Sequence, residues 1–184
     1  MASTIPIWRR KPNASVICLV EFSLKDGLLR GAGLTIRATH GRGGITLHKR
    51  EGDGATPIGL LKLTRVLYRA DRVAPPRCLV PVEPLSPQDG WCDDPADPAY
   101  NQPVRLPYPA SHETLWRDDG VYDIIGVLGW NLNPVVSGRG SAIFFHIATP
   151  DYAPTAGCVA LNLADMQKTL AAGLSAILVS PPGN

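Results

Sequence analysis

The chain has 184 residues, of which 45% are hydrophobic and 18% charged, and its formal net charge at pH 7 is +2. This length suits one domain, residues 1–184, with a hydrophobic core that needs no metal or disulfide to hold it. The near-neutral charge excludes the strongly basic surface of nucleic-acid-binding domains, so we expect no nucleic-acid partner.

Residues 1–13 carry three basic side chains, and an apolar run follows over 14–22. Basic residues followed by an apolar run weakly resemble a secretory signal, but the Val and Ile content of 15–22 favours a β-strand. Lys25-Asp26-Gly27 is typical of a hairpin turn, with a second strand beginning at Leu28. No run of eighteen apolar residues occurs, so we expect no transmembrane helix.

Residues 33–70 alternate short apolar runs with glycine-rich turns, which predicts a mainly β sandwich or barrel. The glycines of 41–44 lack the Lys-Ser/Thr of a phosphate loop, so we interpret them as a turn. Gly52-Asp53-Gly54 also reads as a turn, because a calcium loop needs further oxygen ligands at alternate positions.

Residues 71–109 are rich in proline and show no helical period. A structureless connection of this length is usually a lid or a binding loop. We therefore expect a capping loop over a substrate cleft, with Trp91 and Tyr100 as rigid walls and its acidic side chains set against a cationic amine; the alternative is a rigid surface crossover. Cys78 and Cys92 are able to pair in an oxidising compartment. The scattered His and Cys residues do not match a zinc site, so we expect no metal.

Residues 112–120 suggest a short helical turn that begins after Ser111 and ends at Gly120. Val121–Leu128 predicts a buried strand, and residues 129–134 a turn. Near the end of the chain, Asn162 is a candidate cap for a short helix over 163–172, and residues 176–180 predict a last strand.

An apolar run ends at His146, and a second one, Val159–Leu161, follows Cys158 directly. This pattern puts an imidazole and a thiol at the ends of two predicted strands. An imidazole within reach activates a thiol as a nucleophile, and Gly157 lets the backbone turn so that the N–H groups of residues 157 and 158 point at an oxyanion. The alternative is an ordinary buried cysteine and a core histidine.

Two blocks resemble the L,D-transpeptidase catalytic domain family (YkuD-like). His146 followed by Thr155-Ala156-Gly157-Cys158 is similar to the family's active-site signature, and Gly52-Asp53-Gly54-Ala55-Thr56-Pro57-Ile58-Gly59 is similar to its upstream block. The resemblance implies a mainly β, single-domain barrel or sandwich with a short helix after the nucleophile. It also implies an enzyme without a cofactor.

By this resemblance, Cys158 attacks a peptidoglycan stem peptide at an L-centre, His146 is the general base, and an amine of a neighbouring stem resolves the thioester. Carbapenems resemble the donor and are expected inhibitors. Since the substrate lies in the cell envelope, a periplasmic location is implied. The expected substrate contacts are Thr155, Tyr122, Asn131, Arg117 and Arg139, besides the walls named above.

The chain departs from the family at Ala156, where many members have a second His, and at Ala160, where many have Arg or Asn. These departures leave open which L-centre is attacked, and so whether a 3-3 or a shorter 1-3 type cross-link forms. Two other functions also remain open: an L,D-carboxypeptidase, in which water resolves the thioester, and a non-catalytic peptidoglycan-binding module.

Overall fold

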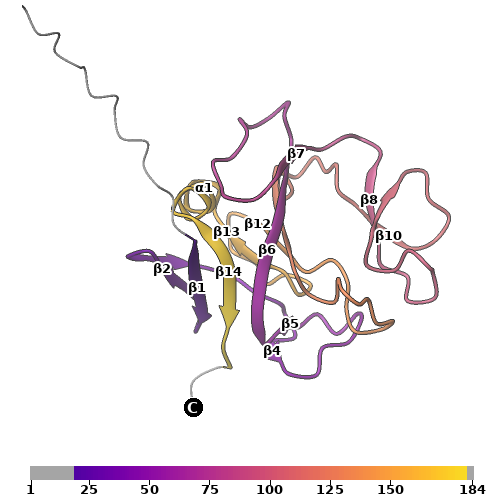
Figure 1. Ribbon diagram of the computed structural model, residues 1–184, viewed down its shortest axis with the longest axis horizontal. Coiled ribbons are helices and arrows are strands. Elements are labelled where there is room, and N and C mark those ends of the chain that lie inside the picture. Colours follow the sequence, from indigo (N-terminus) through magenta and orange to yellow (C-terminus); the bar gives the residue numbers. More distant parts are fainter. Residues whose placement is uncertain (1–18, 182–184) are drawn as a thin grey trace, which may run out of the picture.

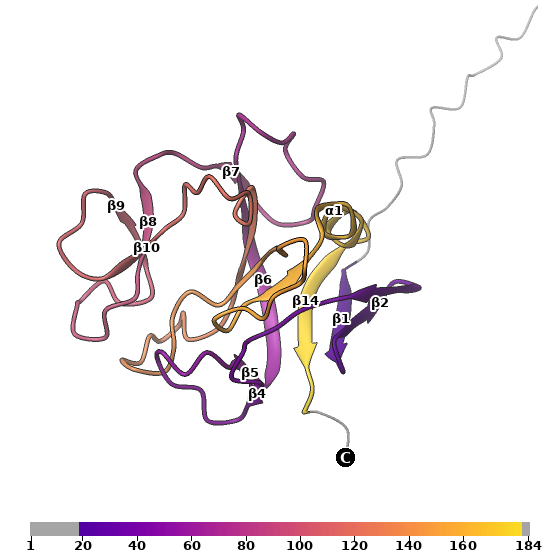
Figure 2. The same ribbon diagram turned by 180° about the vertical axis from the view of Figure 1, so that it is seen from behind.

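The computed structural model describes residues 19–181, and this part of the chain folds into fourteen β-strands and one α-helix (Figures 1 and 2). The interpretation of the first residues as a signal or a strand, as far as residue 18, lies outside the described residues. The strands are β1 (Val20–Lys25), β2 (Leu28–Gly31), β3 (Leu34–Arg37), β4 (Ile45–Thr46), β5 (Thr56–Pro57), β6 (Gly59–Tyr68), β7 (Val82–Pro84), β8 (Asp89–Cys92), β9 (Pro103–Arg105), β10 (His112–Thr114), β11 (Ile124–Leu128), β12 (Phe144–Ile147), β13 (Val159–Leu161) and β14 (Leu174–Val179).

Among the described residues, nine strands form one sheet in the order β13-β12-β11-β6-β14-β1-β2-β3, with β7 joined to β6. Its two edges meet where Thr39, just after β3, and Ala160 of β13 donate their N–H groups to each other's carbonyl oxygens, both at 2.9 Å. Pairing the edges satisfies backbone groups that an open sheet would leave exposed. The sheet is thus nearly closed, and the predicted mainly β fold of the barrel type is confirmed.

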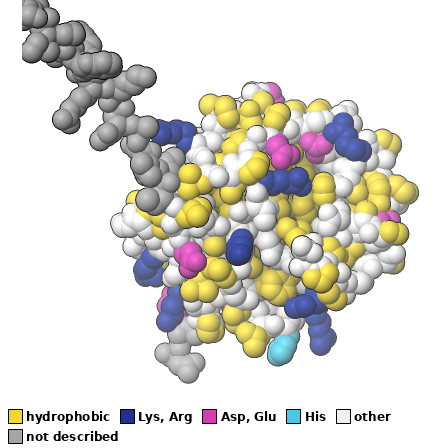
Figure 3. All heavy atoms as spheres, in the orientation of Figure 1, with side chains coloured by type: hydrophobic (Ala, Val, Ile, Leu, Met, Phe, Trp, Pro, Cys, Tyr) yellow, Lys and Arg dark blue, Asp and Glu magenta, His cyan; other side chains and the backbone are white. Residues whose placement is uncertain are grey.

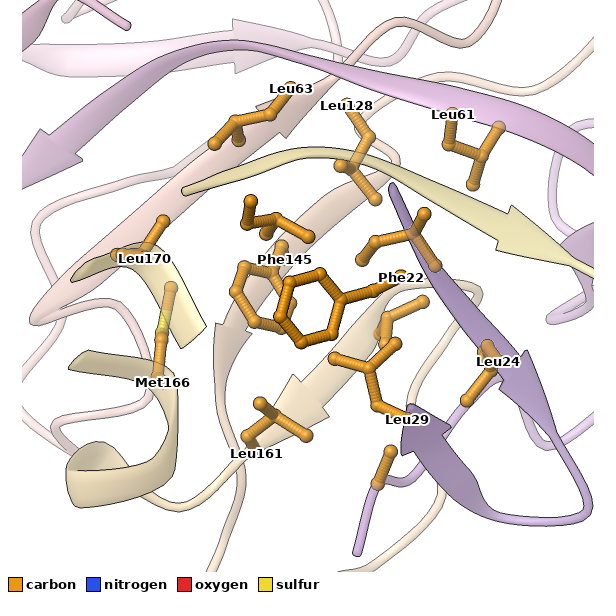
Figure 4. Close-up of a cluster of buried hydrophobic side chains, with 14 of the residues drawn as sticks. Phe22, Leu24, Leu29, Leu61, Leu63, Leu128, Phe145, Leu161, Met166 and Leu170 are labelled. Atoms are coloured by element: carbon orange, nitrogen blue, oxygen red, sulfur yellow. The ribbon is translucent and has the colours of Figure 1, made fainter. Parts of the chain in front are cut away.

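The core of the barrel is apolar and fully enclosed. Phe22 of β1 and Phe145 of β12 lie side by side at its centre, and neither side chain is exposed to solvent (Figure 4). Leu29 packs on one side of the two rings, and Met166 and Leu170 on the other. The core therefore holds β12, one of the strands of the functional site, in a fixed position.

The helix α1 (Leu163–Ala171) begins and ends where the sequence predicts. The Asn162 side chain accepts a hydrogen bond from the Asp165 N–H and caps the first turn, and Gly173 follows the end with a φ of +94°. No helix within residues 19–181 is long and apolar enough to cross a membrane.

The proline-rich segment 71–109 contains the strands β7, β8 and β9, so the expectation that it lacks secondary structure is wrong. Strand β7 joins the barrel sheet, and β8 lies between β9 and β10 in a separate three-stranded sheet beside the barrel (Figure 2). The predicted helical turn at 112–120 is wrong as well, because His112–Thr114 pairs with Gly90–Cys92 as a strand. Local sequence does not reveal this pairing, since the partner is some twenty residues away.

The glycine-rich turn packs tightly against the later Gly-Asp-Gly block. A Cβ atom on Gly41 would lie 2.3 Å from the Gly54 carbonyl oxygen, and one on Gly43 would lie 2.4 Å from the Asp53 carbonyl oxygen. Both contacts are too close for any side chain. These glycines therefore bring two loop segments together, as a turn rather than a phosphate loop.

Three free cysteines occur in the described part of the chain: Cys78, Cys92 and Cys158. The Cys78 thiol donates to the Val80 carbonyl oxygen at 3.4 Å. Cys78 and Cys92 are therefore not joined by a disulfide bond in this structure.

On the face of the molecule in Figure 3, acidic and basic side chains are scattered among apolar ones.

Candidate active site

Two neighbouring parallel strands carry the thiol and the imidazole. His146 of β12 lies opposite Ala160 of β13. Because side chains alternate along a strand, Cys158, two residues before Ala160, is on the same face. Phe144, two residues before His146, packs with Cys158 in a second buried cluster, apart from the barrel core. The alternation thus presents both groups to one side of the sheet.

The Cys158 thiol is buried, with 7% of the residue exposed. It donates to the Ala142 carbonyl oxygen at 3.2 Å and accepts from the Phe144 N–H at 3.3 Å. Burial, together with the negative charge of Glu113, raises the pKa of the thiol to about 12. At neutral pH Cys158 is therefore a protonated thiol.

The His146 imidazole is also buried, and its Nδ1 lies 2.9 Å from the Ile147 carbonyl oxygen. A carbonyl oxygen only accepts, so Nδ1 carries the proton and Nε2 keeps its lone pair. Burial lowers the pKa of His146 to about 4. The Tyr122 ring meets the imidazole edge to face, with 5.3 Å between the centroids. The residue is thus a neutral base held as one tautomer.

Both groups border one cavity of about 660 Å³, a size suited to a small peptide. No hydrogen bond joins Cys158 to His146 in the described part of the chain, since each binds a backbone carbonyl instead. The structure therefore holds a neutral thiol and a neutral imidazole rather than a preformed ion pair. Proton transfer requires the thiol to turn from the Ala142 oxygen towards the imidazole.

The two sequence blocks meet at the loop before Cys158. Thr56 is fully buried; its hydroxyl donates to the Gly157 carbonyl oxygen at 2.8 Å and accepts from the Gly41 N–H at 2.9 Å. Gly157 has a φ of +139°, and a Cβ atom there would lie 2.9 Å from the Ala55 carbonyl oxygen. Only glycine fits this close approach.

Thr155 shapes the same loop and borders the cavity. Its hydroxyl donates to the Cys158 carbonyl oxygen at 2.7 Å and accepts from the Gly157 N–H at 3.1 Å. The N–H of Gly157, which the sequence predicts as an oxyanion donor, is therefore bound within the loop in this structure.

Tyr122 and Arg117, two of the predicted substrate contacts, border the cavity. The Tyr122 hydroxyl donates to Glu113, and burial raises its pKa well above the usual value. The Arg117 guanidinium forms an ion pair with Asp119 and lies 5.2 Å from the centroid of the Tyr122 ring. The positive charge of Arg117 is therefore already paired with a carboxylate.

Asn131 and Arg139 do not border the cavity. The Asn131 amide donates to the carbonyl oxygens of Val136 and Gly140, at 2.9 and 3.1 Å. The Arg139 guanidinium lies 5.7 Å from the centre of the Trp130 ring. In this structure both side chains organise the turn between β11 and β12.

Trp91 and Tyr100 also lie outside the cavity lining. Trp91 is 2% exposed, donates its indole N–H to Asn101, and meets the Phe144 ring edge to face at 5.2 Å. The Tyr100 hydroxyl donates to Glu51, which does border the cavity. The prediction that these two aromatic side chains form walls of the cavity is therefore wrong: Trp91 packs on Phe144, and Tyr100 binds a side chain of the lining.

Three side chains of the lining were not found by sequence reasoning. Lys49 is buried, with its Nζ 2.5 Å from an Asp53 oxygen, and its place beside the Gly-Asp-Gly block was the available signal. Glu113 reaches the cavity through the unforeseen strand β10. Arg42 lies within the glycine-rich turn 41–44, and its guanidinium lies over Gly54. It has no carboxylate partner among the described residues.

Residues 19–181 contain no group of three or more His, Cys, Asp or Glu side chains arranged to hold a metal ion. The sequence model of the L,D-transpeptidase catalytic domain (YkuD) matches residues 24–172. A comparison with curated proteins finds no match.

Proposed function

The chain belongs to the L,D-transpeptidase catalytic domain family, whose substrate is peptidoglycan, and from this premise we propose that it is a cysteine acyltransferase that cross-links stem peptides. The observation that carries the proposal is the pairing of a buried thiol with a neutral imidazole of fixed tautomer on one cavity. A neutral base is what an uncharged thiol needs, because the base takes the proton as the nucleophile attacks.

In the proposed acylation step, the Cys158 thiol turns towards the imidazole and gives its proton to His146 Nε2. The sulfur attacks the carbonyl carbon of an L-residue in the donor stem, and a tetrahedral oxyanion forms. As the C–N bond breaks, the imidazolium returns the proton to the departing amine of the D-residue. The products are a thioester on Cys158 and a free D-amino acid.

We assign the Cys158 N–H as the first oxyanion donor. The Gly157 N–H joins it only after releasing the Thr155 hydroxyl, which it binds at 3.1 Å. Thr155 therefore has a role in keeping the loop in its shape, besides the substrate contact that the sequence predicts.

In the second step, the amine of a neighbouring stem attacks the thioester, His146 takes its extra proton, and the sulfur leaves to be reprotonated. The product is a cross-linked dimer. Water in place of the amine gives a shortened monomer, which is the carboxypeptidase reaction. The two routes differ only in the acceptor.

We propose Arg42 as the residue that binds a carboxylate of the donor stem. It is exposed at the cavity, and it has no carboxylate partner among residues 19–181. Arg117 must first leave Asp119, and Arg139 lies on the turn beside Trp130, so both are weaker candidates. A planar guanidinium suits a carboxylate through two parallel hydrogen bonds.

The small side chains of Ala156 and Ala160 border the cavity and leave room beside the nucleophile. We therefore keep both cross-link types in the proposal: acylation at the third stem residue gives 3-3 bridges, and acylation at the first gives 1-3 bridges. The substrate implies that the protein acts in the cell envelope, and a carbapenem is expected to acylate Cys158.

The experiment is incubation of the purified protein with defined muropeptides, with product masses measured by mass spectrometry. A dimer lacking the mass of the expelled residue, absent with Cys158→Ala, is the expected result, and its fragmentation identifies the acylated residue. Shortened monomers alone would make the protein a hydrolase. No product from any stem would favour the binding module.

A further inference from the structure

Three carboxylates from separate segments border the cavity without an ion-pair partner among the described residues: Glu51, Asp93 and Glu113. They are close enough to interact, because the negative charges of Asp93 and Glu51 add to burial in raising the pKa of Glu113. Like charges gathered in one place repel one another. Arg117 offsets part of the charge of Glu113, and the wall keeps an excess of negative charge.

Asp93 differs from its acidic neighbours in having an unsatisfied oxygen. Its Oδ1 is buried and has no hydrogen-bond partner. By contrast, Asp94 Oδ1 accepts from the Ala96 N–H at 2.9 Å, and Asp97 Oδ1 accepts from the Ala99 N–H and the Tyr108 hydroxyl. A buried acceptor without a donor destabilises the structure, and more so when it is charged.

A second buried acceptor on the same cavity is also unsatisfied. Ser141 is 7% exposed, and its hydroxyl oxygen has no partner. Asp93 and Ser141 are the side chains with such an atom within residues 19–181. Both border the cavity that holds Cys158, so an incoming ligand can supply the missing donors.

None of the three lining cations binds these carboxylates within residues 19–181. The Arg42 side chain lies against Gly54. Lys49 is bound by Asp53 and by the Arg50 carbonyl oxygen, and Arg117 is paired with Asp119. The carboxylates are not arranged as ligands of a metal ion in the described part of the chain. The ligand class that fits this wall is therefore an organic cation with several N–H donors.

We propose that Glu51, Asp93, Glu113 and Ser141 form a subsite for a primary ammonium group on the side chain of a stem peptide's diamino acid. A primary ammonium has three N–H donors and no acceptor, which matches a wall of three carboxylates on which Asp93 Oδ1 and the Ser141 hydroxyl oxygen lack a hydrogen-bond partner. The identity of the ligand rests on the proposed function; the preference for an ammonium rests on the site alone.

The subsite also links substrate binding to the nucleophile. The negative charge of Glu113 is one reason why the thiol keeps its proton. An ammonium bound beside Glu113 offsets that charge and favours the thiolate. A substrate with the ammonium is therefore expected to acylate faster than the same substrate without it.

The first experiment measures binding, so that it does not depend on turnover. A tripeptide stem ending in a diamino acid, and the same stem with its side-chain amine acetylated, are titrated into the Cys158→Ala protein by calorimetry. We expect the free amine to bind at least about tenfold more tightly, a difference of about 1.4 kcal/mol, because acetylation removes the charge and two of the three N–H donors.

Asp93→Asn in the same background is expected to reduce this preference to less than about threefold, a difference well under 1.4 kcal/mol. Asn keeps the shape of Asp, and equal melting temperatures check the fold. Asp94→Asn is the matched control, because it removes the same charge one residue away and should leave the preference unchanged. Equal affinity for the two stems, no binding of either, or an unchanged preference in Asp93→Asn would overturn the proposal.

The second experiment identifies the source of the ammonium in the active protein. If it belongs to the donor, acetylating the donor amine lowers the rate of acyl-enzyme formation at least about tenfold, as does Asp93→Asn with the free donor. If it belongs to the acceptor, acylation is unchanged and the acceptor KM rises instead. A protein that never forms an acyl-enzyme refutes the proposed function, whereas the calorimetry still decides the subsite.

Discussion

At the residue scale, Cys158 and His146 are both uncharged, because each is buried and burial disfavours the charged form. The imidazole is oriented by the Ile147 carbonyl oxygen, and the thiol by the backbone at residues 142 and 144. The Cys158 thiol thus keeps its proton at neutral pH. Such a thiol is protected from oxidation, which requires the thiolate.

The lowered pKa of His146 predicts a loss of stability in mild acid. The unfolded chain takes up a proton near pH 6.5, but the folded protein only near pH 4. Stability from this group is therefore full above pH 6.5 and is lost as the pH falls to about 4. The total loss is roughly 3 kcal/mol, from 1.36 kcal/mol per pKa unit.

Urea unfolding at several pH values measures this effect. His146→Gln should remove this part of the pH dependence, whereas His48→Gln, at an exposed position, should retain it. A His146→Gln protein with the same slope as the parent between pH 6.5 and 4 would show that another group is responsible.

Gly157→Ala tests the geometry of the loop. The added Cβ atom meets the Ala55 carbonyl oxygen at 2.9 Å, and the φ of +139° is strained for alanine. We expect a loss of about 1–3 kcal/mol in the free energy of unfolding, together with a large fall in acylation rate. Gly33→Ala is a useful control, because it also has a positive φ but open space around it. Equal acylation rates in the two variants would argue against a special role for residue 157.

Cys158 and His146, the proposed reacting pair, could be selected from the sequence because both residues lie in short local blocks. No local sequence motif points to Arg42, to Glu113 or to the unsatisfied oxygen of Asp93. Their positions depend on how distant segments pack around the cavity. The sequence suggested Arg117 and Arg139 as substrate contacts, but the structure pairs Arg117 with Asp119 and places Arg139 beside the Trp130 ring.

At the element scale, Thr56 joins the segments that build the site. Its hydroxyl binds Gly41 on one side and Gly157 on the other. Two sequence blocks about one hundred residues apart are thereby held together at the nucleophile. This contact gives a physical reason for a threonine at that place in the upstream block.

Thr56→Val should destabilise the protein by about 1–3 kcal/mol, since it leaves the Gly41 N–H buried without an acceptor. Thr56→Ser keeps the hydroxyl and should recover most of the stability. Thermal unfolding of the three proteins provides the comparison. If valine and serine behave alike, the hydroxyl is not the stabilising group.

Several elements followed from local signals alone: the hairpin of β1 and β2 from its Asp-Gly turn, α1 from its cap and spacing, and β13 from its apolar run. The three-stranded sheet of β8, β9 and β10 did not. Its strands are short and proline-flanked, and they form by pairing with one another rather than by local preference. Prediction therefore failed where structure depends on distant partners.

At the scale of the whole molecule, the barrel holds the site through its core. β12 presents Phe145 to the core on one face and His146 to the cavity on the other. The Thr39–Ala160 bridge closes the sheet beside the nucleophile. Strand β12 thus belongs both to the hydrophobic core and to the candidate active site.

Phe22→Ala should lower the free energy of unfolding by about 3–5 kcal/mol, because it opens a cavity at the centre of the core. Leu178→Ala, on β14 and 41% exposed, is the control and should change it by less than about 0.5 kcal/mol. Chemical denaturation checks both. Similar losses in the two variants would contradict the account of the core.

The most direct test of the central claim is the intact mass of the protein after brief incubation with a tetrapeptide stem. The account predicts an adduct equal to the stem minus its expelled D-residue, mapped to Cys158 by peptide fragmentation and absent from Cys158→Ala. His146→Gln should form it much more slowly. An unmodified wild-type protein, or the same adduct in Cys158→Ala, would contradict the assignment of Cys158 as the nucleophile.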